Sequence, residues 1–191
     1  MGGNLAGMKI AILATNGVEE AELVEPRKAL DEAGATTVLA TPGNKSIQAM
    51  KHDEKSETFE SDTAIDDLEA EEFDGVLLPG GALNADALRI DKDAQKFVQE
   101  IDRAQKPIAV ICHGPWLLIN AKLTKGRALT SYYTIEDDLV NAGAKWFDEE
   151  VVRDRNWVSS RKPSDIPAFN KELLALFSEG SAKSRVATAW R

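Results

Sequence analysis

The chain has 191 residues, 43% of them hydrophobic, a size and composition typical of one compact domain with a sizeable core. The 23 Lys and Arg against 32 Asp and Glu give a formal net charge of -9, which disfavours a nucleic-acid partner. A single cysteine excludes an intramolecular disulfide and fits a reducing compartment. No charged segment or long apolar stretch precedes Lys9, so we expect a cytoplasmic protein without signal peptide or membrane span, and a loose leader at residues 1–7.

The first part of the chain alternates between strand and helix patterns. An apolar run at Met8–Ala14 predicts a buried strand, and Thr36–Ala40 predicts a second one. Helical spacing of apolar residues fills Val18–Ala33 between them, where Pro26 either begins the main helix or kinks a longer one. A strand, a helix and a strand at this spacing form a βαβ unit, which implies a parallel sheet.

The segment from Thr41 to Asp74 is the least regular part of the chain. Short alternating pieces at Ile47–Met50 and Thr58–Phe59 predict a hairpin at the edge of the sheet. Eleven acidic residues fall between positions 53 and 74, which favours a solvated surface over a binding role. His52 is one of only two histidines in the chain, so we expect no metal site, and we expect no cofactor.

The second part continues the alternation and predicts a single domain over residues 1–191, without internal repeat or linker. The predicted fold is a three-layer α/β/α sandwich with a doubly wound, mostly parallel sheet and a small β-hairpin. The expected elements are a strand at Gly75–Pro79, a helical turn at Asn84–Arg89, a helix at Asp91–Gln105, a strand at Ile108–Ile111, a helix from Trp116, a strand at Ala128–Ser131, a helix at Ile135–Ala142, a hairpin of Val151–Val152 with Trp157–Val158, a helix at Ile166–Phe177, and a polar tail at Gly180–Arg191 that is mobile or used in assembly.

The most informative stretch is the one in which a β-branched run at Ile108–Ile111 ends in Cys112 and turns at once into a helix. This order is that of a nucleophile elbow, which exposes the side chain at the top of a sheet, and Gly114 is the small residue that lets the helix pack closely. A thiol at a helix N-terminus is expected to favour the reactive thiolate. The alternative is that Cys112 is a small buried apolar residue at a strand end.

Three predicted loops leave the carboxyl ends of central strands, where ligands bind in open parallel sheets. They carry Glu19 with Glu20, then Gly80-Gly81, then Cys112-His113. We expect Cys112 to be the nucleophile of an acyl or carbonyl reaction, with the backbone N–H groups of His113 and of Gly81 or its neighbour pointing at a developing oxyanion. The candidate oxyanion and substrate-binding residues are Gly80, Gly81 and Gly114.

Two kinds of acid–base partner are available to the thiol. A glutamate of the first loop, packed under apolar walls, would have a raised pKa and could exchange a proton with the thiol and the substrate. The alternative is that Glu19, Glu20 and Glu22 are ordinary first-turn acids favoured by the helix dipole. His113 needs a third group in order to act as a base, and Asp86 is a candidate. Alternatively, His113 serves packing only and Asp86 is an ordinary surface acid.

Around these residues the sequence resembles the PfpI family, of the superfamily that includes the Parkinson-linked protein deglycase. The similarity runs from about Met8 to Phe177, and so many motifs in one order are more specific for the family than for its substrate. The resemblance implies a flavodoxin-like fold of the class I glutamine amidotransferase-like type. The motifs are AVICHGP at 109–115, LLPGG at 77–81, EEFD at 71–74, TSY at 130–132, DDLVNAG at 137–143 and NWVSSR at 156–161.

The resemblance implies catalytic roles for Cys112 and His113, and it matches the acid of the family's first loop to Glu19. In the PfpI branch a carboxylate reaching across a subunit interface completes a Cys-His-acid triad. Asp86 matches that carboxylate if one residue is inserted in the loop after Gly81, and it is an aspartate where some members have glutamate. A homodimer or hexamer would then be part of the site.

The function implied by the resemblance is cysteine-dependent stress protection, by a deglycase or glutathione-independent glyoxalase that acts on reactive aldehydes or glycation adducts. One alternative is an intracellular cysteine peptidase, which needs His113 as a base and a groove for an extended peptide. Another is a redox-responsive chaperone, because an accessible low-pKa thiol oxidises readily. A glutamine amidotransferase is excluded, because that enzyme needs a histidine far downstream of the cysteine and none follows His113.

Overall fold

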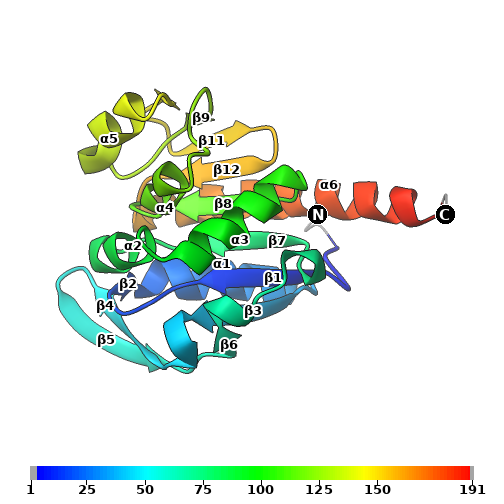
Figure 1. The fold of residues 1–191 in the computed structure, drawn as a ribbon, viewed down its shortest axis with the longest axis horizontal. Coiled ribbons are helices and arrows are strands. Elements are labelled where there is room, and N and C mark those ends of the chain that lie inside the picture. Colours follow the sequence, from blue (N-terminus) through cyan, green and yellow to red (C-terminus); the bar gives the residue numbers. More distant parts are fainter. Residues whose placement is uncertain (1–3, 190–191) are drawn as a thin grey trace.

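One mostly parallel sheet forms the centre of the molecule (Figure 1). The structure, a computed structural model, describes residues 4–189, and the side chains of residues 4–180. All neighbouring strands of this sheet are parallel except the antiparallel pair at one edge, so the predicted α/β fold with a doubly wound sheet and a small hairpin is confirmed. The strands, in sheet order, are β11 (Val151–Asp154), β12 (Trp157–Ser160), β8 (Ile108–Ile111), β7 (Gly75–Leu78), β1 (Lys9–Leu13), β3 (Thr36–Thr41) and β6 (Thr63–Ala64).

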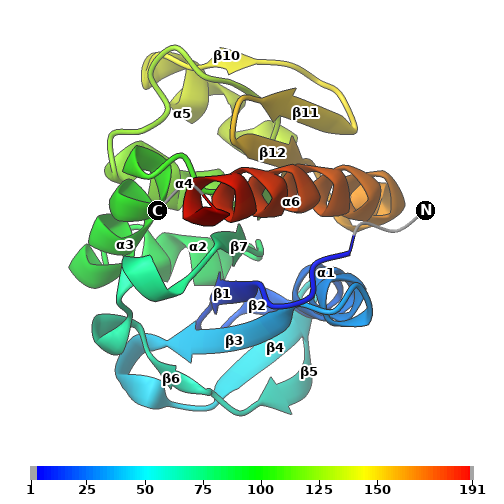
Figure 2. The ribbon, with the colours of Figure 1, turned by 90° about the vertical axis from the view of Figure 1, so that its right-hand side faces the viewer.

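Helices cover both faces of this sheet. They are α1 (Glu20–Glu32), α2 (Ala82–Leu88), α3 (Lys92–Arg103), α4 (Pro115–Asn120), α5 (Glu136–Asn141) and α6 (Ile166–Ala189). In β1, Ile10 and Ile12 belong to a core with α1 and α6, whereas Ala11 and Leu13 belong to a core with α3 and α4. Figure 2 accordingly shows α1 and α3 on opposite sides of the strands. None of the described helices combines the length and apolar character needed to cross a bilayer.

Two short sheets lie outside the central one. The first joins β2 (Val18–Glu19) to the hairpin of β4 (Ile47–Lys51) and β5 (Glu54–Phe59). The hairpin predicted at the edge of the main sheet therefore exists, but its partner is β2, a strand too short to be visible as a pattern. The strand predicted at Ala128–Ser131 is β9 (Ala128–Leu129), which pairs with β10 (Lys145–Trp146) and not with the central sheet.

The two ends of the described chain differ from prediction. The described part of the expected leader, residues 4–7, is not loose, because Leu5 is fully buried and its N–H donates to Ala33 O at 2.9 Å. The polar tail expected from Gly180 is helical as far as Ala189, and the last turns of α6 extend beyond the sheet in Figure 1. One glycine costs a helix only about 1 kcal/mol, so it need not end one. Positions 1–3 and 190–191 of these predictions lie outside the described residues.

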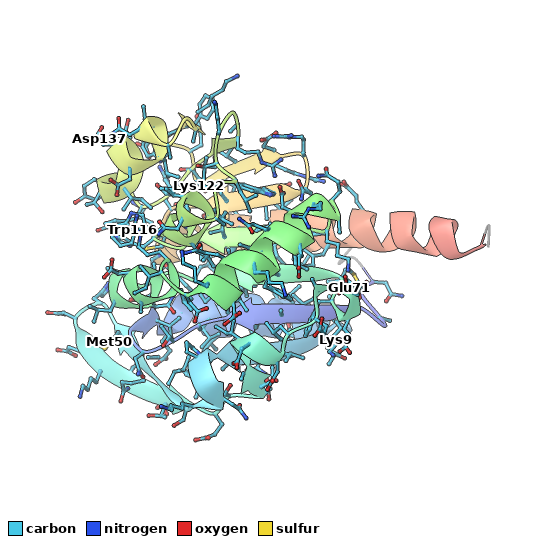
Figure 3. All side chains as sticks on the ribbon, in the orientation of Figure 1. Lys9, Met50, Glu71, Trp116, Lys122 and Asp137 are labelled. Atoms are coloured by element: carbon cyan, nitrogen blue, oxygen red, sulfur yellow. The ribbon has the colours of Figure 1, made fainter. Side chains whose placement is uncertain are left out.

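The first helix begins later than predicted. The expectation placed its start at Val18, but Val18 and Glu19 form β2, and α1 runs from Glu20 with Pro26 inside it. The loop from β1 to α1 thus lies at the carboxyl end of β1. Figure 3 shows Trp116, just after β8, and Met50 of β4 at this same end of the molecule, opposite Lys9, the residue at which β1 begins. Several loops therefore converge where ligands bind in this class of fold.

Candidate active site

Cys112 lies on a strained turn between β8 and α4. Its φ is 62°, in the left-handed region that residues other than glycine rarely adopt. The turn is held from both sides, because the Cys112 N–H donates to Ser160 O at 3.0 Å and the Cys112 carbonyl accepts from Tyr132 N–H at 2.9 Å. A Cβ on Gly114 would lie 2.8 Å from a backbone oxygen of β7, so only glycine fits at the start of the helix. The strand–turn–helix geometry predicted for a nucleophile elbow is present, but Cys112 is buried and not exposed as predicted. Its catalytic role stays a prediction.

The two glycines after β7 let the backbone approach this cysteine. A Cβ on Gly80 would lie 2.4 Å from Glu22 Oε2 and 2.5 Å from Cys112 Cβ. The Gly80 N–H is used to hold Glu22, at 2.9 Å from Oε2, so it does not serve as the predicted oxyanion donor. The backbone N–H groups of Gly81 and His113 lower the pKa of the Cys112 thiol. N–H groups that favour the charged sulfur can also stabilise negative charge that develops beside it.

The carboxyl beside Cys112 belongs to Glu22, on the first turn of α1. The Glu22 side chain is fully buried, and its Oε1 has no hydrogen-bond partner among the described residues. Burial is the main cause that raises the pKa of Glu22 to about 8, and the charge of Glu19 adds to it. The neighbouring Cys112 thiol and the hydrogen bond from the Gly80 N–H act in the opposite direction. A carboxyl with this pKa holds its proton at neutral pH and can exchange it with the thiol.

Glu19, the acid expected to touch the cysteine, has a different position. It ends β2, it is half-buried, and its Oε2 accepts a hydrogen bond from His52 N–H at 3.0 Å. The structure therefore assigns the buried carboxyl to Glu22 instead of Glu19, whose charge acts on Glu22 from the side. The sequence contains a signal for this, because Glu22, Pro26 and Leu30 follow one another at intervals of four residues on the buried face of α1.

The pKa of the Cys112 thiol is raised, and this corrects the expectation of a thiol ionised near neutrality. Burial is the largest cause, the charge of an ionised Glu22 is the second, and the backbone N–H groups of Gly81 and His113 oppose both. The helix that follows has only six residues. Since the thiol does not release its proton unaided at neutral pH, a neighbouring base must take that proton when the sulfur reacts.

His113 lies on the other side of Cys112, among aromatic side chains. Its Nδ1 is 3.1 Å from Cys112 Sγ, and its Nε2 is 3.3 Å from Thr134 Oγ1. The ring stacks on Tyr132, with centroids 4.9 Å apart, and has a tilted contact with Trp116 at 5.2 Å. Burial lowers the pKa of His113 from its ordinary value of 6.5, so the imidazole is neutral at pH 7.

Asp86, the predicted third member of a triad, is exposed on α2. Within the part of the chain that the structure describes, no hydrogen bond or ion pair joins Asp86 to His113, whose outer nitrogen faces Thr134 instead. A triad with Asp86 inside one chain is therefore not formed. An Asp86 supplied by a second copy of the chain stays a prediction.

A pocket of about 650 Å³ opens over Cys112. Several of its residues escaped the sequence analysis, because they come from loops that are distant in the chain and carry no motif. The described residues include no group of three histidine, cysteine or acidic side chains placed to hold a metal ion. The pocket is lined by Gly17, Glu19, Glu22, Met50, His52, Asp53, Gly81, Ala82, Leu83, Cys112, His113, Tyr132, Lys162, Pro163 and Ser164.

Asn84 is a supporting residue that the sequence analysis also missed. It is fully buried on α2, and its Nδ2 donates to the carbonyl oxygens of Pro79 and Gly80 at 3.1 and 2.9 Å. Its Oδ1 accepts from Thr15 N–H at 2.7 Å. Asn84 thus ties the glycine loop to the loop that follows β1, and no local pattern in the sequence distinguishes it from a helix-surface asparagine.

Comparison with known proteins agrees with this arrangement. The sequence model of the DJ-1/PfpI family matches residues 8–176. The chain is 40% identical over 169 residues to a protein of Pyrococcus furiosus named deglycase PfpI. The aligned region covers 88% of this chain and 99% of the relative. It is 43% identical over 169 residues to a Bacillus subtilis protein named "Putative cysteine protease YraA". This aligned region covers 88% of this chain and 97% of the relative.

A solved structure from Anabaena variabilis extends the comparison to three dimensions. That protein has a DJ-1/ThiJ/PfpI-like and a ferritin-like domain, and it matches with a TM-score of 0.85 at 34% identity, over 92% of this chain and 49% of its own. The resemblance to the PfpI family predicted from the motifs is thereby confirmed: the chain belongs to the DJ-1/PfpI family.

Proposed function

We propose that this protein is a cysteine-dependent enzyme that acts on reactive aldehydes or on glycation adducts. The observation that carries this proposal is a buried glutamic acid, Glu22, that lies beside a thiol, Cys112, in the lining of one pocket. Enzymatic activity of this family is indicated by relatives that are named as a deglycase and as a cysteine protease. The reaction class and the substrate are the parts that we infer from the site.

Two groups compete for the thiol proton, and their pKa values favour one of them. The pKa of Glu22 is raised to about 8, whereas that of His113 is lowered from 6.5. The difference of at least 1.5 pKa units corresponds to about 2 kcal/mol in favour of a proton on Glu22. A base is most effective when its pKa lies near the working pH. Glu22 therefore holds its proton at neutral pH and can exchange it with Cys112 and the substrate.

The same carboxyl can serve every proton transfer of an aldehyde reaction. With a 2-oxoaldehyde such as methylglyoxal, the sulfur adds to the aldehyde carbon while Glu22 gives its proton to the new oxygen and takes the thiol proton, which gives a hemithioacetal. Glu22 then moves a proton from the aldehyde carbon to the neighbouring carbon, which gives a thioester of lactate. Water hydrolyses this thioester to lactate and regenerates the thiol, so that no external oxidant or reductant is consumed. A glycation adduct would release its amine in the corresponding hydrolysis.

The N–H groups of Gly81 and His113 would stabilise the oxygen that becomes negative in these steps. Both lower the pKa of the Cys112 thiol, so they favour negative charge at this point of the pocket. His113 holds its imidazole neutral at the pocket wall, where it can donate or accept a hydrogen bond without taking the thiol proton.

A cysteine peptidase is the second candidate, and the name of the Bacillus subtilis relative favours it. A peptidase of this type uses a histidine oriented by a carboxylate. In the described chain His113 Nε2 faces the Thr134 hydroxyl at 3.3 Å, so the carboxylate would have to come from another subunit. A homodimer or hexamer that supplies Asp86 is the arrangement this candidate requires.

The test is lactate formation from methylglyoxal without glutathione. We expect turnover in the wild type and its loss in Cys112→Ser and in Glu22→Gln. Glu25→Gln is the matched control, because it makes the same change of carboxyl to amide at an exposed position of the same helix. Turnover that survives Cys112→Ser would overturn the proposal. Casein cleavage without aldehyde turnover would favour the peptidase, and holdase activity alone, unchanged by Cys112→Ser, would favour a redox-responsive chaperone.

A further inference from the structure

Charged residues line the pocket on two sides of Cys112. Glu19 ends β2, directly after β1, and Asp53 lies in the turn between β4 and β5. Lys162 follows β12. In the central sheet β12 and β1 lie on opposite sides of β8, the strand that ends at Cys112. The pocket therefore has an acidic wall and a basic wall, with the thiol between them.

Lys162 is the only lysine or arginine among the residues that line this pocket. Its neighbour Arg161 is paired with Asp148 and Asp165, each at 2.8 Å. Among the described residues no ion pair involves Lys162 itself, whereas Arg161 has two carboxylate partners. Lys162 is exposed to solvent, and an exposed lysine that lines a pocket without an ion-pair partner is available to a negative group of a ligand.

The size of the pocket indicates a ligand larger than the smallest aldehydes. Its volume of about 650 Å³ lies within the range of about 300–1,000 Å³ that is usual for sites of small organic ligands. A three-carbon aldehyde bound at Cys112 would leave the space toward Lys162 empty. A longer substrate could fill that space and reach the ammonium group with its far end.

We propose that Lys162 forms an anion subsite, and that the preferred substrates are aldehydes or adducts that carry a carboxylate or a phosphate group. The anionic end lies at Lys162 and the carbonyl carbon at Cys112. The acidic wall formed by Glu19 and Asp53 repels the anionic end, so it disfavours the reverse orientation. The identity of the reacting carbon rests on the proposed function, whereas the preference for a negative charge beside Cys112 does not.

The first experiment measures this preference without enzyme turnover. Cys112 is the only cysteine, so its alkylation by iodoacetate, an anion, and by iodoacetamide, its neutral counterpart, can be followed by mass spectrometry. In both reactions the sulfur displaces iodide and the thiol proton passes to solvent. We expect Lys162→Gln to lower the ratio of the iodoacetate rate to the iodoacetamide rate about threefold, and Lys162→Glu to lower it further. Lys125→Gln, at an exposed lysine outside the pocket, should leave the ratio unchanged.

The second experiment compares three 2-oxoaldehydes as substrates. Lys162→Gln should lower kcat/KM for the carboxylate 4,5-dioxopentanoate or for hydroxypyruvaldehyde phosphate, with little effect on methylglyoxal. The products of the anionic substrates are 2-hydroxyglutarate and 3-phosphoglycerate, formed by addition of one water as for lactate. The anionic substrate whose kcat/KM falls more in Lys162→Gln identifies whether the subsite prefers a carboxylate or a phosphate.

The two experiments separate the possible failures. If no aldehyde is turned over but the alkylation ratio depends on Lys162, the proposed function fails and the anion subsite stands. If aldehydes are turned over and neither the alkylation ratio nor kcat/KM depends on Lys162, the anion subsite is overturned and the proposed function stands.

Discussion

Cys112 has two acid–base neighbours in different surroundings, Glu22 on what we call its inner side and His113 on its outer side. On the inner side, Glu22 and Gly80 are packed against the thiol so tightly that a single added carbon would collide with both the carboxylate and the cysteine. On the outer side, His113 lies among aromatic rings, and its second nitrogen faces only the Thr134 hydroxyl. The inner neighbour has a raised pKa and the outer neighbour has a lowered one. Because these pKa values differ in direction, we infer that the histidine next to Cys112 in sequence is not its acid–base partner.

The largest expected effect is that of Glu22→Gln on turnover. The amide keeps the shape of the side chain and the acceptor for the Gly80 N–H, but it cannot take the thiol proton. General acid–base catalysis commonly contributes about 10²–10⁴-fold, so kcat at pH 7 should fall by at least about 100-fold. His113→Gln should cost much less, as measured by lactate formation. If His113→Gln lowered kcat by about 100-fold or more and Glu22→Gln had only a small effect, His113 and not Glu22 would be the acid–base group.

The same substitution should change stability in a pH-dependent way. The folded protein keeps the Glu22 proton up to about pH 8, whereas the ordinary carboxyl pKa is 4.5. The unfolded state binds fewer protons between these values, so the free energy of unfolding of the wild type falls as the pH rises, by about 3 kcal/mol between pH 4.5 and pH 7. Urea denaturation of Glu22→Gln should lack this decline. A decline of equal size in both proteins would contradict the assignment of the raised pKa to Glu22.

Gly80→Ala should disturb the inner side without changing any charge. The new carbon would lie 2.4 Å from Glu22 Oε2 and 2.5 Å from Cys112 Cβ, so one of them must move. We expect a loss of about 2 kcal/mol in the free energy of unfolding and a loss of turnover. Gly126→Ala is the control, because its Cβ would meet nothing within 4 Å, although its φ of 77° brings some strain. Turnover unchanged in Gly80→Ala would mean that the tight contact is not needed.

Thr134→Val should have the smallest effect. It removes the hydroxyl 3.3 Å from His113 Nε2 and preserves the shape of the side chain, so the imidazole loses a hydrogen bond but keeps its contacts with Tyr132 and Trp116. We expect kcat to fall by less than about fivefold, and Thr134→Ser to restore it. A loss as large as that of Glu22→Gln would show that the outer side governs the reaction after all.

Much of the fold could be predicted from local patterns. The buried strands are short β-branched runs, and the elbow combines such a run with Cys112 and Gly114, a pattern with few other interpretations. The parts that were missed depend on contacts distant in sequence. β2 has only two residues and exists because it pairs with β4, and Leu5 is buried because α1 ends beside it. The sequence pattern within these segments predicts neither the pairing of β2 with β4 nor the burial of Leu5.

The acid of the site shows where sequence reasoning reaches its limit. Glu19, Glu20 and Glu22 lie within one helical turn, and the residue at which α1 begins decides which of them faces the sheet. Helix ends are the least certain part of a prediction from sequence. The interval of four residues from Glu22 to Pro26 and again to Leu30 is the signal that identifies the buried one. Lys162 has no such signal, because only the converging loops bring it to the pocket.

The pH dependence of Cys112 alkylation by iodoacetamide tests the central claim most directly. The pair of Glu22 and Cys112 loses its first proton near pH 8, so the alkylation rate of the wild type should rise through an apparent pKa of about 8. This step should be lost in Glu22→Gln and retained in His113→Gln. A step that persists in Glu22→Gln and disappears in His113→Gln would contradict the claim that the inner carboxyl controls the thiol.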